Sequence, residues 1–398
     1  MSSYATIDLE TSIKNRGEDA VGKNKASPFH KENKICYTGM KSGGVYEEWE
    51  SVKFSRKYLS IPYHVKMLVG ANIKFDLLYL MRDYEYVREW LKTGRIWDVQ
   101  LAEYLLTGQE HKWAKLDDLA VKYGGSVKDD RLKELWDNDV DTEDIDPDII
   151  SPYLEGDVLN TELVFKKQIE QAKDMDMLPL MWEQMDALLA TTEMEFNGMA
   201  FDKGRCLRDS MAIMRNVDSA ECELTNTIAD VLDIDYTAAN CSSVDQVSKT
   251  LFGGEVTEKV DQPVLNDDGT AYRFKSGKRK GEVKTVLKNV FKHVRGFGFT
   301  PLEEWKTKKE GVYKVNDDVL KALRRHPNIE PDEASFIETL MYFRKLNKDL
   351  KTYYIGYSNL VWHDGCIHPQ FNHCATATGR LSHSAPNLGN VSHSKEDD

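Results

Sequence analysis

The sequence predicts an α/β domain followed by a mainly helical domain, on three observations. Short apolar strands alternate with amphipathic helices over the first 173 residues, as in an α/β sheet. From residue 178 onwards, apolar residues recur at three- and four-residue steps over long stretches, which indicates helices. The length of 398 residues is too great for one ordinary hydrophobic core. We therefore expect two or three domains.

The composition limits the class of protein. Hydrophobic residues make up 41% of the chain and charged residues 30%, as in a folded globular protein. No run approaches the length of about 18 apolar residues needed to cross a bilayer, and no basic, apolar leader comes before Asp8. Six scattered cysteines without a C-x-x-C pair fit reduced thiols. The sequence therefore predicts no membrane contact and a cytoplasmic location.

The charge is distributed unevenly along the chain. The formal net charge is −13, yet Ala271 to Arg295 contain nine Lys or Arg residues and one acid, Glu282. At the other extreme, Asp129 to Asp148 contain ten acids and two basic residues. A protein that repels phosphate over most of its surface can hold a polyanion at one basic strip. We expect DNA backbone contacts there, through Lys278, Arg279 and Lys280 in particular; the alternative is a solvated loop.

The first predicted strand, residues 5–11, ends in two carboxylates. Asp8 and Glu10 are two residues apart, so in a strand they project from the same face. Two carboxylates on one face repel each other when buried, which favours open solvent or a bound divalent cation. Residues 35–39 read as a second strand of the same sheet.

Two later segments add carboxylates in compatible positions. Residues 67–72 read as an apolar strand that runs directly into a helix over 73–81, which places Asp76 in the first helical turn. In open α/β sheets, ligands bind near such strand ends. A further helix is predicted to begin at Ser151-Pro152, with Tyr153 and Asp157 one turn apart on one face.

The remaining helices of the first domain are predicted to be packing elements. The patterns over 97–106 and 115–124 are amphipathic, and the second is closed by a glycine. The acidic run 137–141 has acids at the first, third and fifth positions of a calcium loop. However, Thr142 stands where that loop requires Gly, and Asp148 stands where a bidentate Glu is expected. A solvated acidic loop is the expectation.

These motifs together resemble a known family. Asp8-Leu9-Glu10, Asn72-Ile73-Lys74-Phe75-Asp76 and Tyr153-Leu154-Glu155-Gly156-Asp157 resemble, in order and spacing, the three exonuclease motifs of the DEDD nucleases, in the branch with Tyr in the third motif. The resemblance implies a ribonuclease-H-like fold and 3′ to 5′ exonuclease activity with two divalent ions, Mg²⁺ or Mn²⁺. It implies one ion held by Asp8, Glu10 and Asp157, and a second held by Asp8 with Asp76. It also implies contacts of Thr11 and Asn72 with single-stranded DNA 3′ ends.

The chemistry agrees with this implication. Cleaving a phosphodiester in line places negative charge on both the attacking and the leaving oxygen, and two cations about 4 Å apart stabilise both. Four carboxylates balance those four positive charges. The Tyr153 phenol stays protonated near neutral pH, so it can orient the attacking water beside Glu10.

The second half of the chain resembles the thumb of family A DNA polymerases, the DNA polymerase I group. Helical patterns run from 178 to 199, from 207 to 231 and from 336 to 354. The motif Met194-Glu195-Phe196-Asn197-Gly198 resembles the start of that thumb, and the basic strip lies where phage members carry insertions. The resemblance thus implies a helical thumb that carries a DNA-gripping insertion.

The last forty residues resemble the segment that opens the polymerase palm. The stretch Thr376 to Asn390 includes Thr-Gly-Arg and Pro-Asn-Leu motifs, with His383 and Gly389 where Ser and Gln are commoner. The resemblance implies that Arg380, Asn387 and Asn390 contact the minor groove of primer-template DNA. The hydrogen-bond acceptors in that groove are common to all base pairs, so such contacts can test pairing geometry without reading the sequence. A zinc site made from His363, Cys366, His368, His373 and Cys374 is the alternative, but their spacing fits no standard site.

The resemblance gives a domain plan and a partner. We expect an exonuclease domain over 1–173, a thumb-like domain over 174–358 with an insertion at about 253–312, and a small α+β palm fragment over 359–398. No fingers helix or palm carboxylate motif follows Asn390. We therefore expect the proofreading part of a split or truncated family A polymerase, whose polymerase activity needs a second polypeptide. Its location would be the host cytoplasm if a phage encodes it.

Two rival functions remain. One is a ribonuclease D-like processing nuclease, which the stretch Thr376 to Asn390 argues against. The other is a non-catalytic DNA-binding scaffold for the polymerase half, which the intact set of Asp8, Glu10, Asp76 and Asp157 argues against.

Overall fold

The structure is a computed structural model that describes residues 3–50, 59–126 and 131–391. Asp129 and Asp130 of the acidic segment lie outside the described residues. The chain forms two compact units: residues 1–202 with 356–398, and residues 203–355. We refer to them as unit 1 and unit 2 and describe each separately.

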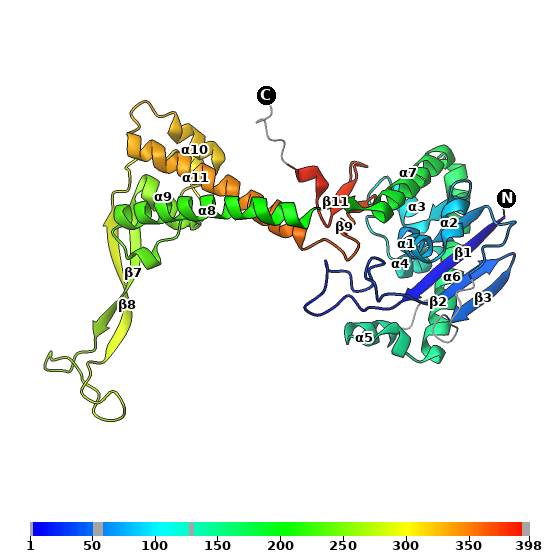
Figure 1. Ribbon diagram of the computed structural model, residues 1–398, viewed down its shortest axis with the longest axis horizontal. Coiled ribbons are helices and arrows are strands. Elements are labelled where there is room, and N and C mark those ends of the chain that lie inside the picture. Colours follow the sequence, from blue (N-terminus) through cyan, green and yellow to red (C-terminus); the bar gives the residue numbers. More distant parts are fainter. Residues whose placement is uncertain (1–2, 51–58, 127–130, 392–398) are drawn as a thin grey trace. The chain divides into compact units, whose positions relative to one another are not determined.

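Unit 1 is built on a mixed five-stranded sheet (Figure 1). The strand order is β3-β2-β1-β4-β5, in which β1, β2 and β3 are antiparallel neighbours and β1, β4 and β5 are parallel. The strands are β1 (Tyr4–Thr11), β2 (Ile35–Ser42), β3 (Val45–Glu50), β4 (Met67–Gly70) and β5 (Arg95–Asp98). The central strand β1 is therefore the one that carries Asp8 and Glu10.

Helices cover this sheet and bury its apolar residues. They are α1 (Ile73–Asp83), α2 (Glu85–Leu91), α3 (Val99–Leu106), α4 (Leu116–Tyr123), α5 (Arg131–Asp137), a short 3₁₀ turn (Thr142–Asp144), α6 (Pro147–Asp174) and α7 (Leu178–Asn197). The core includes the fully buried Trp97 of β5, with Met181, Met185 and Leu188 of α7. Although α7 lies within the predicted thumb-like range, it packs in unit 1. The functional division at residues 173 and 358 stays a prediction.

Two predicted element boundaries are wrong, and both have a local cause. Trp97 and Asp98 end the strand β5 instead of starting a helix, because Asp98 caps α3 by accepting hydrogen bonds from the amides of Gln100 and Leu101. The helix expected from Ser151 begins at Pro147, since Asp146 caps it and proline is well tolerated at the first helical position. Pro152 is accommodated inside α6.

The acidic segment is partly structural and not simply solvated as expected. Asp141 is buried and accepts a hydrogen bond from the amide of Ile13, and its Oδ2 lies 3.3 Å from Lys14 Nζ. Asp139 is exposed and pairs with Lys25 at 2.6 Å. Asp139 and Asp141 therefore hold the loop that follows β1 in place.

The carboxy-terminal segment completes unit 1. It contains β9 (Cys366–Ile367), β10 (Gln370–Asn372), β11 (Ser382–Ser384) and a 3₁₀ turn (Leu388–Asn390); β9 pairs with β6 (Met199–Ala200), and β10 pairs with β11. The hydroxyl of Tyr104 on α3 donates to the carbonyl of Thr376 at 2.7 Å. Cys374 is buried in the same hydrophobic core as the sheet. This segment therefore packs onto the α/β unit.

His373 makes this packing sensitive to acid. Its Nε2 lies 2.8 Å from Oγ1 of Thr191 on α7, and its ring is buried. Burial, with a smaller effect of the Lys74 charge, lowers the pKa of His373 from 6.5 to about 4. Below pH 6.5 the unfolded chain therefore binds a proton that the folded chain refuses until about pH 4, so stability falls as the pH is lowered through this window.

We expect the pH dependence of stability to change in the variant His373→Gln. Glutamine can keep a hydrogen bond to Thr191 and does not titrate. One pH unit within the window is worth about 1.4 kcal/mol, so the wild-type chain should lose about 2 kcal/mol more than the variant between pH 7 and 5. Denaturant unfolding at the two pH values measures this difference. Equal losses in the two proteins would contradict the role of His373.

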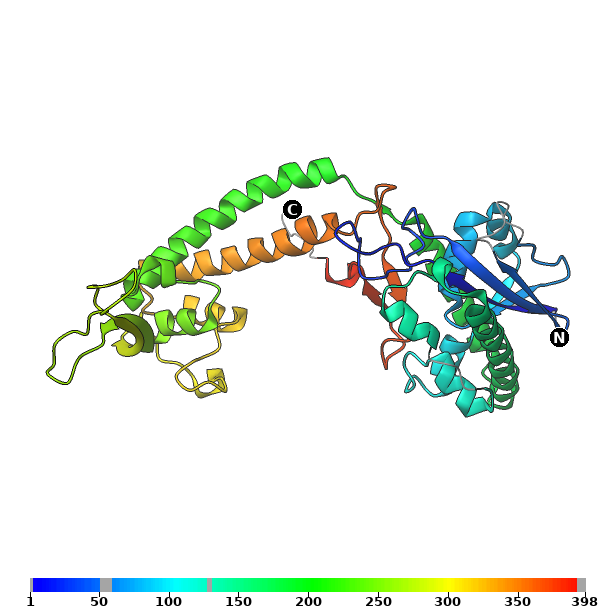
Figure 2. The same cartoon turned by 90° about the horizontal axis from the view of Figure 1, so that it is seen from below.

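Unit 2 is a helical body that carries a β-ribbon. Its elements are α8 (Lys203–Leu232), α9 (Val244–Phe252), α10 (Asp317–Arg324), α11 (Pro331–Asp349), a π-helical stretch (Leu350–Gly356) that reaches the unit boundary, two 3₁₀ turns (Tyr236–Ala238 and Glu303–Trp305), β7 (Gly254–Pro263) and β8 (Thr285–Val294). The long helices α8 and α11 lie side by side (Figure 2) and share a separate core that includes Leu224, Ile228 and Leu340. Within the described residues, no helix combines the length and apolarity that a membrane span needs.

Candidate metal centre and adjoining cavity

Three carboxylates meet at the centre of unit 1. One ligand oxygen from each of Asp8, Glu10 and Asp157 lies within 4.8 Å of the other two. Asp8 and Glu10 project from the same face of β1, as strand alternation requires. Asp157 comes from α6, which lies close to this face of the sheet. Gly39 of β2, the cross-strand partner of Asp8, leaves room for this helix because it has no side chain; a Cβ atom there would lie 2.9 Å from Cγ of Leu154 on α6.

Asp76 lies in the first turn of α1, as predicted, and near enough to Asp8 for the two charges to interact. It is 3% exposed. Burial, and next the nearby charge of Asp8, raise the pKa of Asp76 well above its ordinary value. An acidic group held in this way is stabilised by a cation.

Asp98 is a supporting residue that the sequence analysis missed. Its side chain accepts from the amides of Gln100 and Leu101 and also, at 2.8 Å, from the amide of Ile73. The same carboxylate thus begins α3 and holds the start of α1, the helix that carries Asp76. The signal available in the sequence was an aspartate directly before an amphipathic helix.

The donor set fits a divalent cation that prefers oxygen ligands. Among the described residues, the group with metal-binding geometry consists of Asp8, Glu10 and Asp157, all carboxylates, two of them buried. Carboxylate oxygens suit Mg²⁺ and Mn²⁺, whereas zinc prefers His and Cys. The arrangement can therefore hold at least one such ion beside the buried Asp76.

Tyr153 is held in place near these carboxylates. It precedes Asp157 by one turn of α6, and its ring makes an edge contact with Trp136, with centroids 6.0 Å apart. The Trp136 indole donates to Oγ1 of Thr142 at 3.0 Å, and that hydroxyl donates to the carbonyl of Thr11 at 2.7 Å. This chain of contacts connects Tyr153 to the end of β1.

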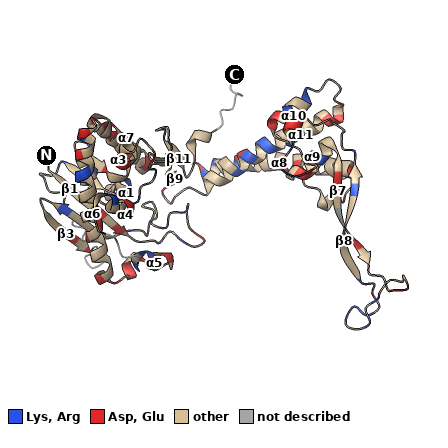
Figure 3. Cartoon of the chain, turned by 180° about the vertical axis from the view of Figure 1, so that it is seen from behind, with Lys and Arg blue, Asp and Glu red and all other residues tan. Residues whose placement is uncertain are grey.

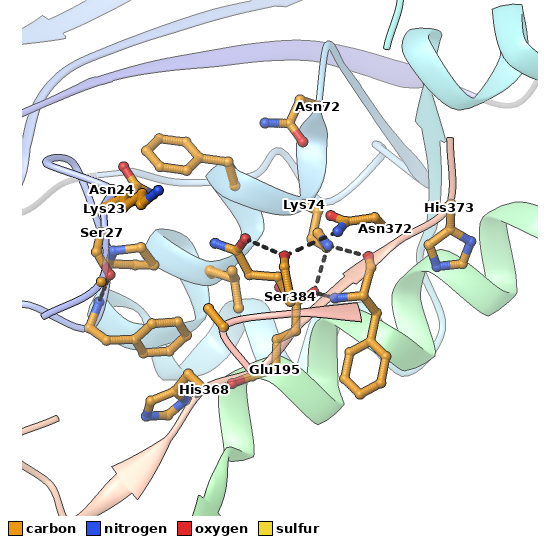
Figure 4. A pocket seen from close by; sticks show the side chains of 18 of the residues that line it. Lys23, Asn24, Ser27, Asn72, Lys74, Glu195, His368, Asn372, His373 and Ser384 are labelled. Atoms are coloured by element: carbon orange, nitrogen blue, oxygen red, sulfur yellow. Dashed lines mark hydrogen bonds and ion pairs between the residues drawn. The ribbon is translucent and has the colours of Figure 1, made fainter. Parts of the chain in front are cut away.

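A cavity of about 980 Å³ lies at the amino end of α1 (Figure 4). Its wall includes Asn72, which precedes α1, Phe75 of α1, Trp113, and Phe371 and Asn372 of β10. Asn72 has a left-handed backbone with φ of 55°, and it lies one turn before Asp76. Asp8, Glu10, Asp76 and Asp157 are not among the described residues that line the cavity. The cavity therefore lies beside α1, the helix that carries Asp76, and not at the carboxylates themselves.

An ion pair between Lys74 and Glu195 forms part of the wall of this cavity. Lys74 Nζ lies 2.6 Å from Oε1 of Glu195 on α7 and donates to the carbonyl of Phe371 at 2.7 Å. Glu195 also accepts from the Phe371 amide at 2.5 Å, and its carbonyl lies 2.7 Å from Nδ1 of His368. Burial raises the pKa of Glu195, and Lys74 opposes that shift. Figure 4 shows these side chains converging from three elements.

The other predicted contact residues are distributed over both units. Arg380, Asn387 and Asn390 are exposed in the turns around β11, where Asn387 caps the last 3₁₀ turn by accepting from the Gly389 amide. Lys278, Arg279 and Lys280 lie in unit 2. Thr11 is buried at the end of β1. The structure therefore brings Asp8, Glu10 and Asp157 together, with Asp76 near Asp8, and places Tyr153 one turn before Asp157 on α6.

The histidines considered for zinc are engaged in protein contacts. His368 Nε2 lies 2.9 Å from Asp364, and its ring stacks on Phe29 with centroids 3.6 Å apart. His373 contacts Thr191. Within the described residues, these side chains form no group with metal-binding geometry.

Comparison with known proteins gives a family relationship. Residues 281–398 match the model of DNA polymerase family A. The DNA polymerase of Bacillus phage SP01 is 24% identical over 97% of this chain, which corresponds to 42% of that protein. DNA polymerase I of Geobacillus stearothermophilus is 30% identical over 42% of this chain and 17% of its own length. The chain thus spans less than half the length of these relatives.

A solved structure has a similar fold. The POL domain of Pol1 from M. smegmatis, solved in complex with DNA primer-template and dNTP, aligns with a TM-score of 0.60. The alignment covers 100% of this chain and 53% of that one, at 18% identity.

Proposed function

Because this chain is related to DNA polymerase family A, we propose that its α/β unit is a 3′ to 5′ exonuclease that acts on DNA 3′ ends with two divalent ions. The observation that carries the proposal is the meeting of Asp8, Glu10 and Asp157 within 4.8 Å, beside the buried Asp76. The sheet order, with an antiparallel β3-β2-β1 meander followed by parallel β4 and β5, supports a ribonuclease-H-like fold for this unit.

The residues have separate roles in the proposed reaction. Asp8, Glu10 and Asp157 would hold one ion, and Asp8 with Asp76 would hold the second. When bound, such ions stabilise the charge on the attacking and leaving oxygens of the phosphodiester. Tyr153, fixed by Trp136, orients the attacking water with Glu10 by hydrogen bonding. Asp98 keeps α1, and with it Asp76, in position.

The adjoining cavity is suited to the unpaired end of the strand. Its aromatic side chains Phe75 and Trp113 offer faces for base stacking, and the amides of Asn72 and Asn372 offer hydrogen bonds. Its volume of about 980 Å³ is at the upper end of the range of about 300–1,000 Å³ that ligand pockets occupy. Asn72 lines the cavity as the residue before α1, and Asp76 follows it in the first turn of that helix.

Degradation of labelled oligonucleotides tests the function. The purified chain is incubated with a single-stranded DNA, a duplex with a frayed 3′ end and an RNA of the same sequence, with Mg²⁺, with Mn²⁺ or with EDTA. We expect stepwise loss from the 3′ end of DNA that EDTA abolishes. Preferential loss of RNA would favour the ribonuclease D-like alternative, and DNA binding without any metal-dependent cleavage would favour the scaffold.

The variant Tyr153→Phe should retain part of the activity. It keeps the ring and its contact with Trp136 but removes the hydroxyl that orients water, so we expect a loss in kcat of about 10- to 1000-fold with little change in metal affinity. Single-turnover rates at saturating Mg²⁺ measure it. A loss equal to that of a carboxylate variant would mean that Tyr153 supports the metal site itself.

The wider polymerase role remains a set of predictions. We propose that Arg380, Asn387 and Asn390 contact primer-template DNA, that polymerase activity requires a second polypeptide with the remaining palm and the fingers, and that the protein acts in DNA replication in the cytoplasm. The exposure of these three residues is compatible with DNA contact. Gel filtration of the mixed polypeptides, followed by primer extension, measures the partnership: separate peaks without extension would contradict it.

A further inference from the structure

An apolar stripe runs along the first half of α8 in unit 2. Leu207, Met211 and Met214 are spaced four and three residues apart, so they lie on one face of the helix. Their exposed fractions are 58%, 50% and 46%, which are high for apolar side chains. Among the described residues, the core of unit 2 takes Ile213 and Val217 from the same helix but none of these three. The stripe is therefore an apolar face that is open to solvent.

The spacing of the stripe fits a helix as its partner. Helices that dock on protein surfaces make contact through residues at steps of three, four and seven, and Leu207, Met211 and Met214 have these steps. The flexible, polarizable side chain of methionine adapts to the shape of a docked partner. Exposed apolar patches with polar borders are typical of protein interfaces. The other face of α8 is packed in the core, so the stripe lies on a rigid element.

Uncompensated positive charge borders the stripe. Residues 203–215 contain four Lys or Arg residues and one acid, in a chain whose net charge is −13. That acid, Asp209, lies 3.6 Å from Arg205. Arg208 and Arg215 are exposed, and neither has a carboxylate within ion-pair distance in the described part of the chain. Lys and Arg residues along α8 and α11 are blue in Figure 3. A complementary partner therefore carries acidic residues beside its apolar face.

Two other classes of occupant fit this face less well. The backbone of a nucleic acid would pair with Arg208 and Arg215, but it offers no apolar surface to the three side chains between two turns of α8. A helix that lies on a membrane needs a large apolar face. The stripe has only three exposed apolar side chains, because α8 buries its main apolar face in the core. Charge and shape together thus favour a protein partner.

We propose that this stripe, with Arg208 and Arg215, is a docking site for an acidic amphipathic helix of a partner protein. The apolar side chains of the stripe fill the apolar seam of the partner, and the two arginines pair with its Asp or Glu side chains. The stripe belongs to unit 2, whereas the carboxylate cluster belongs to unit 1. The docking site is therefore independent of the proposed exonuclease function.

A charge-swap binding experiment tests the docking site. The probes are labelled helical peptides of about 20 residues that share one leucine seam, bordered by Glu in one peptide and by Lys in the other. Fluorescence anisotropy measures their binding to the whole chain. We expect the Glu peptide to bind at least about tenfold more tightly than the Lys peptide. Arg208→Glu/Arg215→Glu should reverse this order, because it reverses the charge beside the stripe.

Truncation of the stripe tests the apolar contribution. Leu207→Ser/Met211→Ser should weaken binding of the Glu peptide about tenfold or more, since a few apolar anchors carry most of the free energy of such interfaces. The matched control truncates residues of similar exposure elsewhere in unit 2. Val244 and Leu302 are each 50% exposed, so Val244→Ser/Leu302→Ser should leave peptide binding unchanged. Circular dichroism checks that each variant is folded.

Three peptide results would overturn the docking site. They are no detectable binding of the Glu peptide up to about 100 μM, equal binding of the two peptides, and a loss in Leu207→Ser/Met211→Ser no larger than in the control. Two further measurements test the other occupants, namely cosedimentation with vesicles of phosphatidylcholine and phosphatidylserine, and sedimentation velocity of the chain alone. Vesicle binding or self-association that Leu207→Ser/Met211→Ser abolishes would assign the stripe to a membrane or to a second copy, and would also overturn the proposal.

Discussion

Replacing Asp8 with alanine is expected to lower DNA 3′-end degradation by about a thousandfold or more. Asp8 would be a ligand of both ions, and losing metal stabilisation of the transition state costs several kcal/mol, where each 1.4 kcal/mol is about tenfold in rate. The fold should persist, because Asp8 lies among acidic groups whose mutual repulsion the substitution relieves, and its charge contributes to the raised pKa of Asp76. Single-turnover cleavage measures the rate, and circular dichroism checks the fold.

Metal binding gives a readout that does not depend on activity. An ion that binds only the folded chain stabilises it by RT ln(1 + [L]/Kd), so the melting temperature rises as the ion concentration exceeds the dissociation constant. Mn²⁺ should therefore raise the melting temperature of the wild-type chain and raise that of Asp8→Ala much less. Asp118→Ala, which removes an exposed acid of α4, is the matched control and should behave like the wild type. Undiminished cleavage by Asp8→Ala would overturn the assignment of the site.

The carboxylates of this site could be predicted because their geometry is local. Strand alternation places Asp8 and Glu10 on one face, and helical spacing aligns Tyr153 with Asp157. The close approach of α6 to β1 depends on Gly39, which a sequence pattern does not reveal. The end of strand β5 was predicted as helix at Trp97 because a short buried strand and the first turn of a helix have the same apolar pattern.

The placement of α7 shows a second limit of sequence patterns. Its periodicity identified an apolar face with Met181, Met185 and Leu188, but periodicity does not tell which unit covers that face. The β7–β8 ribbon is a third case. Its basic residues could be identified in the sequence, but the fold of the segment that carries them depends on backbone pairing between residues 264 and 284. Charge is a property of the sequence, whereas register is decided by pairing.

The pair formed by Lys74 and Glu195 could not be predicted, since its members are 121 residues apart. It joins α1, which carries Asp76, to α7 and to β10. Removing one member of a buried ion pair leaves the other charge uncompensated and typically costs about 3–5 kcal/mol. We therefore expect Lys74→Met to destabilise unit 1 by an amount of that order, measured by denaturant unfolding near neutral pH.

The pH dependence and the double variant identify the cause. Burial already raises the pKa of Glu195, and without Lys74 that pKa should rise further. Glu195 then binds a proton more readily in the folded state than in the unfolded state. The stability lost in Lys74→Met should therefore become smaller as the pH is lowered. Lys74→Met/Glu195→Met removes both charges and should recover part of the loss.

Hydrogen exchange at the Phe371 amide, which donates to Glu195, should speed up in Lys74→Met. The control Lys92→Met breaks an exposed pair with Glu89 and should change little. A loss in Lys74→Met no larger than in this control would mean that β10 is held by apolar packing and not by the ion pair.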